Sequence, residues 1–585
     1  MTSSSIPSAQ HLIHHCRRED IRHIVISPGS RNAPLIISFT EDPYFTCYSI
    51  VDERCAAFFA LGMAQQLQKP VAVVCTSGSA LLNFYPAVAE AFYSDIPLVL
   101  ISADRPNYKI DIGDGQTIRQ DHVFDRHIGY SANLKQDVSH ATETLRSLAP
   151  AMINDQTSIE KQQKEISDFN NEELQKALGI AADTMAPVHI NIPFEEPLYN
   201  TVTIDEETFS VVEKPVPVTP INEDLSPYLE LWNSSKKKMV LVGVYPPNSI
   251  EQKILDHLAN DPSVLVFTET TSNLHHPNFF KSIDSIIAPI ENADNKEVLF
   301  DALQPDILLT FGGLIVSKKI KAFLRSYKPR HHWHIHEKKA YDTFFSTPVH
   351  FNNSVNSFLK TFLKQSVAVD STYQTKWLKV KNDYLQKRDV YMNQIPFSDL
   401  LAFNHIIAGI PSGYMVQLAN SSTVRYTQLF DMDAGVTVFC NRGTSGIDGS
   451  TSTALGASLV QKSPTVLITG DLSFFYDSNG LWNKYMRPDF RIIVLNNDGG
   501  GIFRILPGKE ETENFQNYFE TTHDLDVQSL CKVYQLEYQK ADSEASLQKA
   551  LATFYEASGT ARVLEIKTPR KLNNEILLAY FDFIS

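Results

Sequence analysis

The stretch that decides the fold spans residues 465 to 503 and reads TVLITGDLSFFYDSNGLWNKYMRPDFRIIVLNNDGGGIF. Its apolar, β-branched start predicts a strand over Thr465–Thr469, which ends next to a glycine and Asp471. We expect a helix from Asp471 to about Met486 and a second strand over Ile492–Leu495. Strand, helix and strand in this order predict a βαβ unit with parallel strands.

Polar residues follow both predicted strands. The carboxyl ends of parallel strands meet at one edge of a sheet, so we expect Asp471 and Asn497 to be neighbours there. A carboxylate, an amide oxygen and backbone carbonyls are hard donors that suit Mg²⁺. The glycines Gly499, Gly500 and Gly501 let the backbone approach a bulky anion. The stretch therefore predicts a site for Mg²⁺ and a diphosphate, although it contains neither a GxxxxGK[ST] loop nor a GxGxxG loop.

Composition and charge limit the class of protein. With 585 residues, 43% hydrophobic and 20% charged, the chain is long enough for three or four domains with large cores. A net charge of −15 argues against nucleic acid as a partner, and no apolar run reaches the roughly 18–20 residues that span a bilayer. The N-terminus lacks the apolar core of a signal peptide, and the six cysteines show no CxxC spacing. We therefore expect a cytoplasmic protein with reduced thiols and no membrane insertion.

Alternating strands and helices along the whole chain predict an α/β fold, with parallel sheets flanked by helices. Prolines and acids at 200–222 predict a linker, and a charged helical segment at 366–395 predicts a bridge. The expected domains are 1–198, 222–365 and 390–585. Further strands are expected at Ile24–Ile26, Thr46–Val51, Val71–Cys75, Pro97–Ser102, Val188–Ile192, Met239–Gly243, Val264–Phe267, Ile307–Phe311, His332–His336 and Arg562–Lys567.

The two polar strand ends carry a resemblance. Gly470-Asp471 followed by Asn496-Asn497 resembles the cofactor motif of thiamine-diphosphate-dependent enzymes. Two further motifs, Asn441–Gly449 (NRGTSGIDG) and Ser27–Arg31 (SPGSR), narrow the match. Together they resemble the family of 2-succinyl-5-enolpyruvyl-6-hydroxy-3-cyclohexene-1-carboxylate synthases, the thiamine enzymes of menaquinone or phylloquinone biosynthesis.

This resemblance implies a reaction and an assembly. A thiamine-diphosphate-dependent transferase would decarboxylate 2-oxoglutarate and add the resulting succinic-semialdehyde carbanion to isochorismate in a 1,4-addition. The products would be 2-succinyl-5-enolpyruvyl-6-hydroxy-3-cyclohexene-1-carboxylate and CO₂. The resemblance also implies the thiamine-diphosphate-binding fold, Mg²⁺ or Mn²⁺, and a homodimer or homotetramer. The pyrimidine-binding domain would come first and the diphosphate-binding domain last, with the cofactor between the first domain of one subunit and the last domain of another.

Two other classes of function stay open at this stage. One is a different thiamine enzyme, such as an acetohydroxyacid synthase or another 2-oxoacid decarboxylase, which handles small or apolar acceptors and needs fewer cations. The other is a scaffold protein that has kept cofactor binding without catalysis. Retention of Glu53, Asp471 and Asn497 together argues against a scaffold.

Glu53 is the candidate catalytic residue. It follows a predicted strand and opens a helix, where an acid also favours the helix dipole without any catalytic role. In the family that Asp52-Glu53-Arg54 resembles, a glutamate bonds the aminopyrimidine ring of the cofactor and promotes deprotonation of the thiazolium carbon C2.

The resemblance also implies residues that bind the cofactor. Asp471, Asn497 and the carbonyl of Gly499 are the implied metal ligands, although a helix cap and a turn would explain the two side chains locally. Ile447 is the implied apolar wedge that bends the cofactor, with packing in a core as the alternative. The whole implied set is Glu53, Ser77, Gly78, Ser421, Gly446, Ile447, Gly470, Asp471, Leu472, Ser473, Asn497, Gly499, Gly500, Ile502 and Phe503.

Cations in loops point to substrates with several negative charges. The guanidinium fork of arginine is the natural partner of a carboxylate, although surface ion pairs would explain any single arginine. The pair Lys318-Lys319 stands where the family more often has lysine and arginine, and a lysine loses the bidentate bond. The implied substrate residues are Ser30, Arg31, Arg105, Gln116, Lys318, Lys319, Ser421, Arg425, Arg442, Phe503 and Leu506.

The run His331-His332-Trp333-His334-Ile335-His336 also invites a metal-site hypothesis. In a strand, His332, His334 and His336 would share one face. Because no carboxylate or cysteine pattern accompanies them, we favour a half-buried strand.

Overall fold

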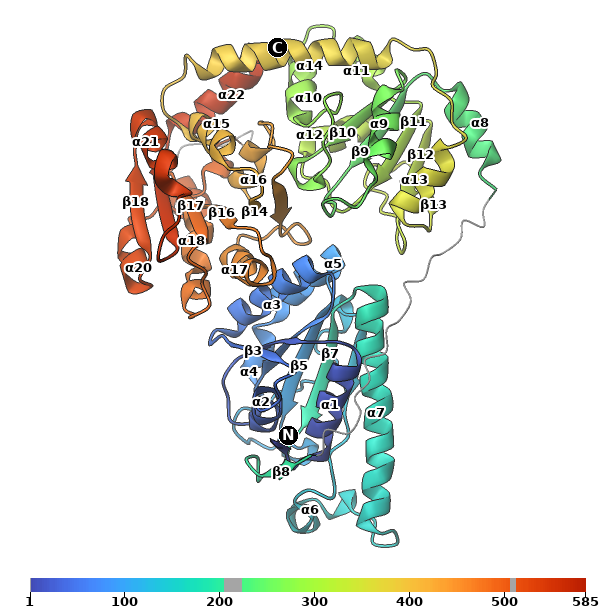
Figure 1. Ribbon diagram of the computed structural model, residues 1–585, viewed down its shortest axis with the longest axis vertical. Coiled ribbons are helices and arrows are strands. Elements are labelled where there is room, and N and C mark those ends of the chain that lie inside the picture. The colour runs from blue at the N-terminus through green and yellow to red at the C-terminus, as the bar shows by residue number, and fades with distance from the viewer. Residues whose placement is uncertain (1, 205–223, 506–511) are drawn as a thin grey trace. The chain divides into compact units, whose positions relative to one another are not determined.

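Three parallel sheets, each flanked by helices, organise the residues that the structure describes (Figure 1). The computed structural model describes residues 2–204, 224–505 and 512–585. The chain divides into two compact units, of which unit 1 holds Met1–Pro215, Gly443–Lys462 and Phe474–Phe490, and unit 2 holds the remainder. The predicted α/β class with parallel sheets is confirmed.

The first sheet lies in unit 1 and has the strand order β3-β2-β4-β5-β7-β6, with all neighbours parallel. Its strands are β2 (His23–Ile26), β3 (Thr46–Ser49), β4 (Val71–Cys75), β5 (Leu98–Asp104), β6 (Tyr130–Asn133) and β7 (Val188–Pro193). The helices of this part of the chain are α1 (Pro7–Arg18), α2 (Ala33–Thr40), α3 (Glu53–Leu67), α4 (Ser79–Leu82), α5 (Tyr85–Ser94), α6 (Thr142–Leu148) and α7 (Ile159–Thr184). Short 3₁₀ turns lie at Asn107–Lys109, Asp125–His127 and Pro150–Met152.

A small antiparallel pair corrects part of the predicted linker. β1 (Thr2–Ser4) pairs with β8 (Thr201–Thr203), so the start of the 200–222 segment is a strand that returns to the N-terminus. Residues 205–223 of the predicted linker lie outside the described residues. A three-residue strand is too short to show a periodic pattern in the sequence.

Unit 1 also takes up two segments from much later in the chain. Helix α17 (Ser450–Val460) packs on α3, and the two backbones come close because Gly62 and Gly456 face the other helix. A Cβ atom on Gly62 would lie 2.0 Å from the carbonyl oxygen of Thr453. This close crossing is one of the contacts that place the segments Gly443–Lys462 and Phe474–Phe490 in unit 1, together with the first sheet.

The second sheet has the order β10-β9-β11-β12-β13 and lies in unit 2. Its strands are β9 (Lys238–Val242), β10 (Val264–Thr268), β11 (Ile307–Phe311), β12 (His331–Ile335) and β13 (Val349–Phe351). Its helices are α8 (Ser226–Ser234), α9 (Gln252–Asn260), α10 (Ile283–Asn292), α11 (Lys296–Leu303), α12 (Lys318–Ser326) and α13 (Val355–Leu363), with a 3₁₀ turn at Thr270–Ser272.

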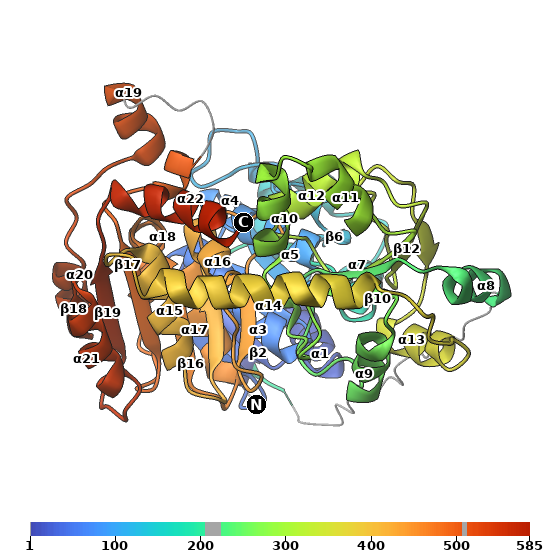
Figure 2. The same cartoon turned by 90° about the horizontal axis from the view of Figure 1, so that it is seen from above.

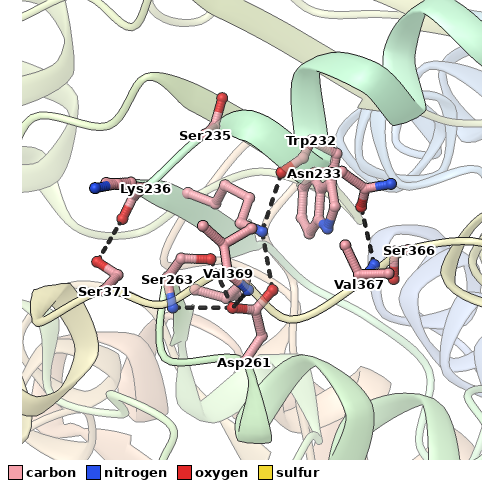
Figure 3. A network of polar contacts seen from close by, with 12 residues as sticks. Trp232, Asn233, Ser235, Lys236, Asp261, Ser263, Ser366, Val367, Val369 and Ser371 are labelled. Carbon is pink, nitrogen blue, oxygen red and sulfur yellow. Dashed lines mark hydrogen bonds and ion pairs between the residues drawn. The ribbon is translucent and has the colours of Figure 1, made fainter.

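A buried ion pair lies at the start of β9 (Figure 3). The Lys238 ammonium donates to Asp261 Oδ2 at 2.9 Å and to the carbonyl of Trp232 at 3.2 Å, and it lies 4.6 Å from the centre of the Trp232 ring. The other oxygen of Asp261 accepts from the backbone and hydroxyl of Ser263. Every polar group of this pair is satisfied, which a buried ion pair requires.

The third sheet has the order β15-β14-β16-β17-β19-β18 and shares a hydrophobic core with the second. Helix α14 (Tyr373–Met392) lies along both, and its Trp377, Tyr384 and Tyr391 join that core (Figure 2). The strands are β14 (Met415–Leu418), β15 (Thr437–Cys440), β16 (Thr465–Gly470), β17 (Arg491–Asn496), β18 (Glu537–Ala541) and β19 (Arg562–Lys567). The remaining helices include α15 (Asp399–Gly409), α16 (Ser422–Thr427), α19 (Glu513–Phe515), a π-helical turn (Gln516–Glu520), α20 (Val527–Val533), α21 (Glu544–Phe554) and α22 (Leu572–Ile584).

The predicted helix from Asp471 to Met486 is wrong in length. The chain forms α18 over Asp471–Tyr476 and a short 3₁₀ turn over Ser478–Leu481, and then runs irregularly to β17. Asp477, Asn479 and Gly480 favour turns, and the Asp477 carboxylate accepts the backbone N–H of Ser452 at 2.7 Å instead of continuing a helix. The parallel pairing of β16 with β17 is as predicted.

Candidate functional site

The carboxylate of Asp471 lies at the carboxyl end of β16, against the glycine turn that follows β17. In the strand register Gly470 pairs with Leu495, so Asp471 and the residues after Asn496 leave the sheet at the same edge. The backbone N–H of Gly499 donates to Asp471 Oδ2 at 2.9 Å, and that of Leu472 donates to Oδ1 at 2.7 Å. The acid and the turn predicted to meet are therefore in contact.

Asn497 is held from its amide nitrogen. Its Nδ2 donates to Asp399 Oδ2 at 2.9 Å, and the Asn497 side chain is buried. Within the described ranges, no residue donates a hydrogen bond to the amide oxygen of Asn497. Burial raises the pKa of Asp399 to about 6, against hydrogen bonds from Thr568 and Asn497 that lower it.

Gly499 sits where only glycine fits. Its φ of +139° is unfavourable for other residues, and a Cβ atom would lie 2.6 Å from the carbonyl oxygen of Glu520. The Gly499 carbonyl accepts the N–H of Gly501 at 3.0 Å, which leaves one lone pair for another partner. The turn is fixed from outside because Glu520 also accepts the N–H of Gly500 and forms a buried ion pair with Arg504.

These donors fit a small, hard cation. One carboxylate, one amide oxygen and one carbonyl give few protein ligands, as Mg²⁺ prefers when phosphates and water complete its shell. Over residues 2–204, 224–505 and 512–585, no cluster of three or more His, Cys, Asp or Glu side chains could hold a metal by itself. The imidazole of His523 lies 3.4 Å from Asp471 Oδ2, and this contact raises the pKa of His523.

The remaining predicted cofactor residues of unit 2 flank this turn or neighbouring strands. Ser421 follows β14, the strand beside β16, and has a φ of +68°. Leu472 and Ser473 continue from Asp471 into α18, and Ile502 and Phe503 lie in the 3₁₀ turn Gly501–Ile505. Phe503 contacts Phe519 with ring centres 6.2 Å apart, while the predicted residue Leu506 lies outside the described residues.

Glu53 lies at the corresponding edge of the first sheet, in unit 1. It is the first residue of α3, whose cap is Asp52, and its side chain is half-buried. No described residue forms a hydrogen bond or ion pair with its carboxylate. Because β3 and β4 flank β2 in parallel, the carboxyl ends that lead to Glu53 and to Ser77 and Gly78 lie at one edge.

The loop that carries Gly446 and Ile447 is anchored by a residue that sequence reasoning missed. The buried carboxylate of Glu90, in α5, accepts the N–H of Gly443 and that of Thr444, each at 2.7 Å. Ile447 is 37% exposed, although apolar, so it is not a core residue of unit 1.

Two predicted substrate arginines of unit 1 converge on one acid. Arg31 is buried, and it donates to the carbonyl of Phe194 at 2.8 Å and to Glu196 at 2.5 Å. Arg105 reaches the same Glu196 carboxylate at 3.9 Å. The hydrogen bonds and charge around Glu196 lower its pKa, against partial burial that raises it. Glu196 is therefore a neighbour of any carboxylate that these arginines bind.

Gln116 and Ser30 lie near the same edge and are both exposed. Gln116 has a φ of +57°, and a Cβ atom on Gly78 would lie 3.3 Å from its carbonyl oxygen. The N–H of Gly78 donates to the buried Gln120 at 2.8 Å. Gln116 is thus packed against the loop of Ser77 and Gly78.

Two acids of unit 2, the buried Glu269 and the partly buried Asp284, lie near its predicted substrate cations. Glu269 accepts the N–H groups of Val316 and Ser317 at 2.7–2.8 Å, and burial raises its pKa to about 7. The charges of Arg425 and Arg442 act on Asp284 and Glu269, respectively, and burial lowers the pKa of Arg425. Arg442 also donates to Asn420 Oδ1 at 2.6 Å.

Lys318 and Lys319 open helix α12 directly after the segment that Glu269 holds. Lys318 is exposed, whereas Lys319 is paired with Glu291. The two lysines therefore differ in how readily they can meet a substrate carboxylate.

The histidine run forms β12, and this strand is buried on both faces, whereas the sequence predicted a half-buried strand. His332 and His334 are both buried, and each shares a hydrogen bond with the hydroxyl of Thr310, at 2.9 and 2.8 Å. Burial lowers the pKa of His332 to about 4. Both faces of β12 are covered: His332 and His334 are buried on one face, and Trp333 and Ile335 pack into a hydrophobic core with α8 and α13 on the other.

Sequence reasoning missed four acids that hold the site: Glu90, Glu196, Glu269 and Asp399. Each contacts a segment that is far away in the sequence. Asp399 and Asn497, for example, are 98 positions apart. Only Asp399 had a local signal, since Ser398-Asp399 is typical of a helix start.

No helix within the described ranges is both long and apolar enough to cross a membrane.

Comparison with known proteins places this geometry in a family. Residues 7–127 match the thiamine pyrophosphate enzyme, N-terminal TPP binding domain, and residues 420–566 match the corresponding C-terminal TPP binding domain. The chain is 54% identical to the 2-succinyl-5-enolpyruvyl-6-hydroxy-3-cyclohexene-1-carboxylate synthase of Christiangramia forsetii, over 100% of both chains. It is 51% identical to the synthase of the same name from Flavobacterium psychrophilum, over 99% of both. The Porphyromonas gingivalis synthase is 37% identical, over 97% of this chain and 95% of the relative.

Proposed function

This chain belongs to the family of 2-succinyl-5-enolpyruvyl-6-hydroxy-3-cyclohexene-1-carboxylate synthases, and we propose that the residues described above bind its cofactor, metal and substrates. It is a thiamine-diphosphate-dependent enzyme that forms a carbon–carbon bond in menaquinone biosynthesis. 2-Oxoglutarate loses CO₂, and the remaining four-carbon unit adds to isochorismate. Bound thiamine diphosphate supplies a nucleophilic carbon and an electron sink for the decarboxylation.

Asp471, Asn497 and the carbonyl of Gly499 would hold Mg²⁺ or Mn²⁺, which would neutralise the negative charge of the cofactor's diphosphate. The contact between Asp471 and the N–H of Gly499 supports this assignment, because it puts the acid and the turn at one point. The glycine turn lies at the same edge, where ligands of open parallel sheets bind.

Glu53 would hold and return the proton that the aminopyrimidine ring of bound cofactor exchanges. The support is that its carboxylate, among the described residues, has no hydrogen-bonded or ionic partner of its own. A half-buried acid that pairs only with the cofactor is free to take up and return a proton.

The substrates are both dicarboxylates, and the arginines match them. Arg31 and Arg105 in unit 1, and Arg425 and Arg442 in unit 2, offer planar forks to carboxylates. Gln116 and Lys318 add a polar and a cationic contact. In a chain of net charge −15, such gathered cations favour anionic substrates over the small acceptors of acetohydroxyacid synthases.

The active protein is a homodimer, or a homotetramer made of two such dimers. In this arrangement Glu53 of one subunit meets the cofactor held by Asp471 of another. The domain boundaries 1–198, 222–365 and 390–585 and the cytoplasmic location remain predictions, and the six free cysteines are consistent with a reducing compartment.

The observation that carries the proposal is the meeting of Asp471 with the Asn497–Gly499 turn, and product analysis tests it. The purified protein is supplied with thiamine diphosphate, Mg²⁺, 2-oxoglutarate and isochorismate, and CO₂ and the adduct are measured. Parallel reactions replace 2-oxoglutarate by pyruvate or contain a chelator. We expect the adduct only with 2-oxoglutarate and metal, whereas preferred turnover of pyruvate would show a different carboligase.

A further inference from the structure

We propose that Asp399 is a positioning residue for the metal site: it fixes the amide of Asn497 so that the oxygen, and not the nitrogen, faces the cation. This inference rests on the proposed metal site. It adds a residue from α15, an element outside both the β16–β17 unit and the glycine turn.

The orientation of an amide is set by its hydrogen bonds. An asparagine amide has a donating and an accepting end, and only the partners of the two ends distinguish them. Asn497 Nδ2 lies 2.9 Å from Asp399 Oδ2. An ionised carboxylate only accepts hydrogen bonds, so a flipped amide would set two oxygens against each other. The contact therefore selects the orientation that turns Oδ1 of Asn497 away from Asp399.

Asp399 is itself held rigidly. The hydroxyl of Thr568, directly after β19, donates to its Oδ1 at 2.6 Å. The N–H of Asp399 donates to Asn573 of α22 at 2.8 Å, and Asn573 also bonds the Thr568 hydroxyl. Because Asp399 is the first residue of α15, the helix dipole also favours its negative charge. The end of β19, helix α22 and the start of α15 therefore hold the Asp399 carboxylate, which in turn orients the Asn497 amide.

The alternative orientation would oppose metal binding. A flipped Asn497 would present two N–H groups to a cation that needs an oxygen ligand. Residues that orient a metal ligand are worth about 10–100-fold in metal affinity. The buried carboxylate also adds negative charge behind the ligand, which favours a divalent cation over water.

The chain contains a matched control one residue away. Asn496 Nδ2 donates to Glu565 Oε1 at 2.6 Å, and both side chains are buried. This pair has the same chemistry as Asn497 and Asp399, but Asn496 is not among the proposed ligands. Glu565→Gln therefore reports the general effect of neutralising a buried acid beside β17.

The test measures Mn²⁺ binding to the full-length protein with thiamine diphosphate present, by the loss of the free-ion electron paramagnetic resonance signal. We expect Asp399→Asn to weaken Mn²⁺ binding about 10-fold or more, and Glu565→Gln to change it less than about twofold. Equal effects of the two variants, or unchanged binding in a folded Asp399→Asn protein, would overturn the inference. If Asp399→Asn does not fold, Thr568→Val, which frees one oxygen of Asp399, must weaken binding several-fold.

A third variant separates this inference from the proposed function. Asn497→Ala removes the ligand itself and must weaken Mn²⁺ binding at least as much as Asp399→Asn. If Asn497→Ala leaves binding unchanged, the proposed metal site is wrong. If it weakens binding while Asp399→Asn does not, the site stands and the positioning role falls.

Discussion

At the residue scale, the acids of the two units differ in what their oxygens contact. Asp399 and Glu269 have their oxygens engaged by hydrogen bonds from the chain, and burial raises the pKa of both. Asp471 accepts the backbone N–H groups of Gly499 and Leu472 and also lies beside the imidazole of His523. Glu53 has no such partner among the described residues. The acids engaged by the chain therefore shape their surroundings, while the buried Asp471, beside the glycine turn, and the half-buried Glu53 are the acids proposed to meet metal and cofactor.

The first prediction concerns Glu53. Glu53→Gln should lower turnover about 100-fold or more, because general acid–base groups contribute roughly 10²–10⁴-fold to rate. Thiamine diphosphate binding and the thermal unfolding midpoint of the apoprotein should change little. Steady-state kinetics, calorimetric cofactor titration and a thermal scan measure the three quantities.

A comparison variant tests whether Glu53 is merely a helix-opening acid. Glu160 stands in the first turn of α7, as Glu53 does in α3. Glu160→Gln should lower the thermal unfolding midpoint only slightly, through the lost interaction of the acid with the helix dipole, and should keep full activity. If Glu53→Gln behaves in the same way, the catalytic assignment is wrong.

At the element scale, the bounds of strands with a clear apolar pattern could be predicted from the sequence. The contacts that irregular segments make with distant parts of the chain could not. The strands Val71–Cys75, Ile307–Phe311 and Arg562–Lys567 have the predicted bounds because their apolar, β-branched residues are buried on both faces. The helix after Asp471 was overextended because turn-forming residues stop it. Asp471 and Asn497 could be placed together from strand order alone, but the contact of Asn497 with Asp399 depends on how α15 packs, which no local pattern encodes.

The second prediction tests the crossing of α3 and α17. An alanine Cβ at Gly62 or Gly456 would lie about 2 Å from a carbonyl oxygen of the other helix, closer than any real contact. Gly62→Ala and Gly456→Ala should therefore destabilise the protein by about 1–3 kcal/mol, despite the better helix propensity of alanine. Thermal unfolding midpoints at one scan rate measure the effect.

Gly179, inside α7, is the matched control for this crossing. Among the described residues, no heavy atom outside the backbone of α7 itself and the adjacent residues lies within 4 Å of a Cβ built there, so Gly179→Ala should stabilise the protein by up to about 1 kcal/mol. A stabilised Gly62→Ala or Gly456→Ala protein would show that the two helices do not approach as closely as described.

The third prediction concerns β12 and pH. Burial lowers the pKa of His332 to about 4, although Asp342 raises it, while the unfolded value is near 6.5. A group whose folded pKa is depressed contributes stability above its unfolded pKa and loses it as pH falls towards the folded value. The wild-type protein should therefore lose stability relative to His332→Gln between about pH 6.5 and pH 4.

Thermal midpoints of the wild-type and His332→Gln proteins at pH 7.5 and pH 5 measure this difference. Glutamine keeps hydrogen-bonding groups for Thr310 and Ser346, which His332 now contacts. We expect the advantage of the wild type at pH 7.5 to shrink by about 1–2 kcal/mol at pH 5. A pH-independent difference would mean that His332 is not buried in the neutral form.

At the scale of the whole molecule, the two units are not continuous stretches of the chain. Segments 443–462 and 474–490 belong to unit 1, although the strands before and after them belong to unit 2. Short-range patterns identified the strands and helices, but the grouping follows from tertiary contacts such as the α3–α17 crossing. The loop of Gly446 and Ile447 thereby lies in the same unit as Glu53, and Asp471 lies in the other.

The fourth prediction tests the proposed shared site by mixing two inactive proteins. The Glu53→Gln variant keeps Asp471, and the Asp471→Ala variant keeps Glu53. If each site takes Glu53 from one subunit and Asp471 from the other, a heterodimer of the two variants contains one site in which both residues are intact. After random exchange of equal amounts, half of the dimers are mixed and each has one intact site of two, which gives about a quarter of wild-type activity.

Co-expression with two affinity tags isolates the mixed dimer, which should then have about half of wild-type activity per dimer. Each variant paired with itself is the control and should remain inactive. An isolated mixed dimer without activity would show that Glu53 and Asp471 of one chain serve the same site, and a monomeric active enzyme would reject the assembly altogether.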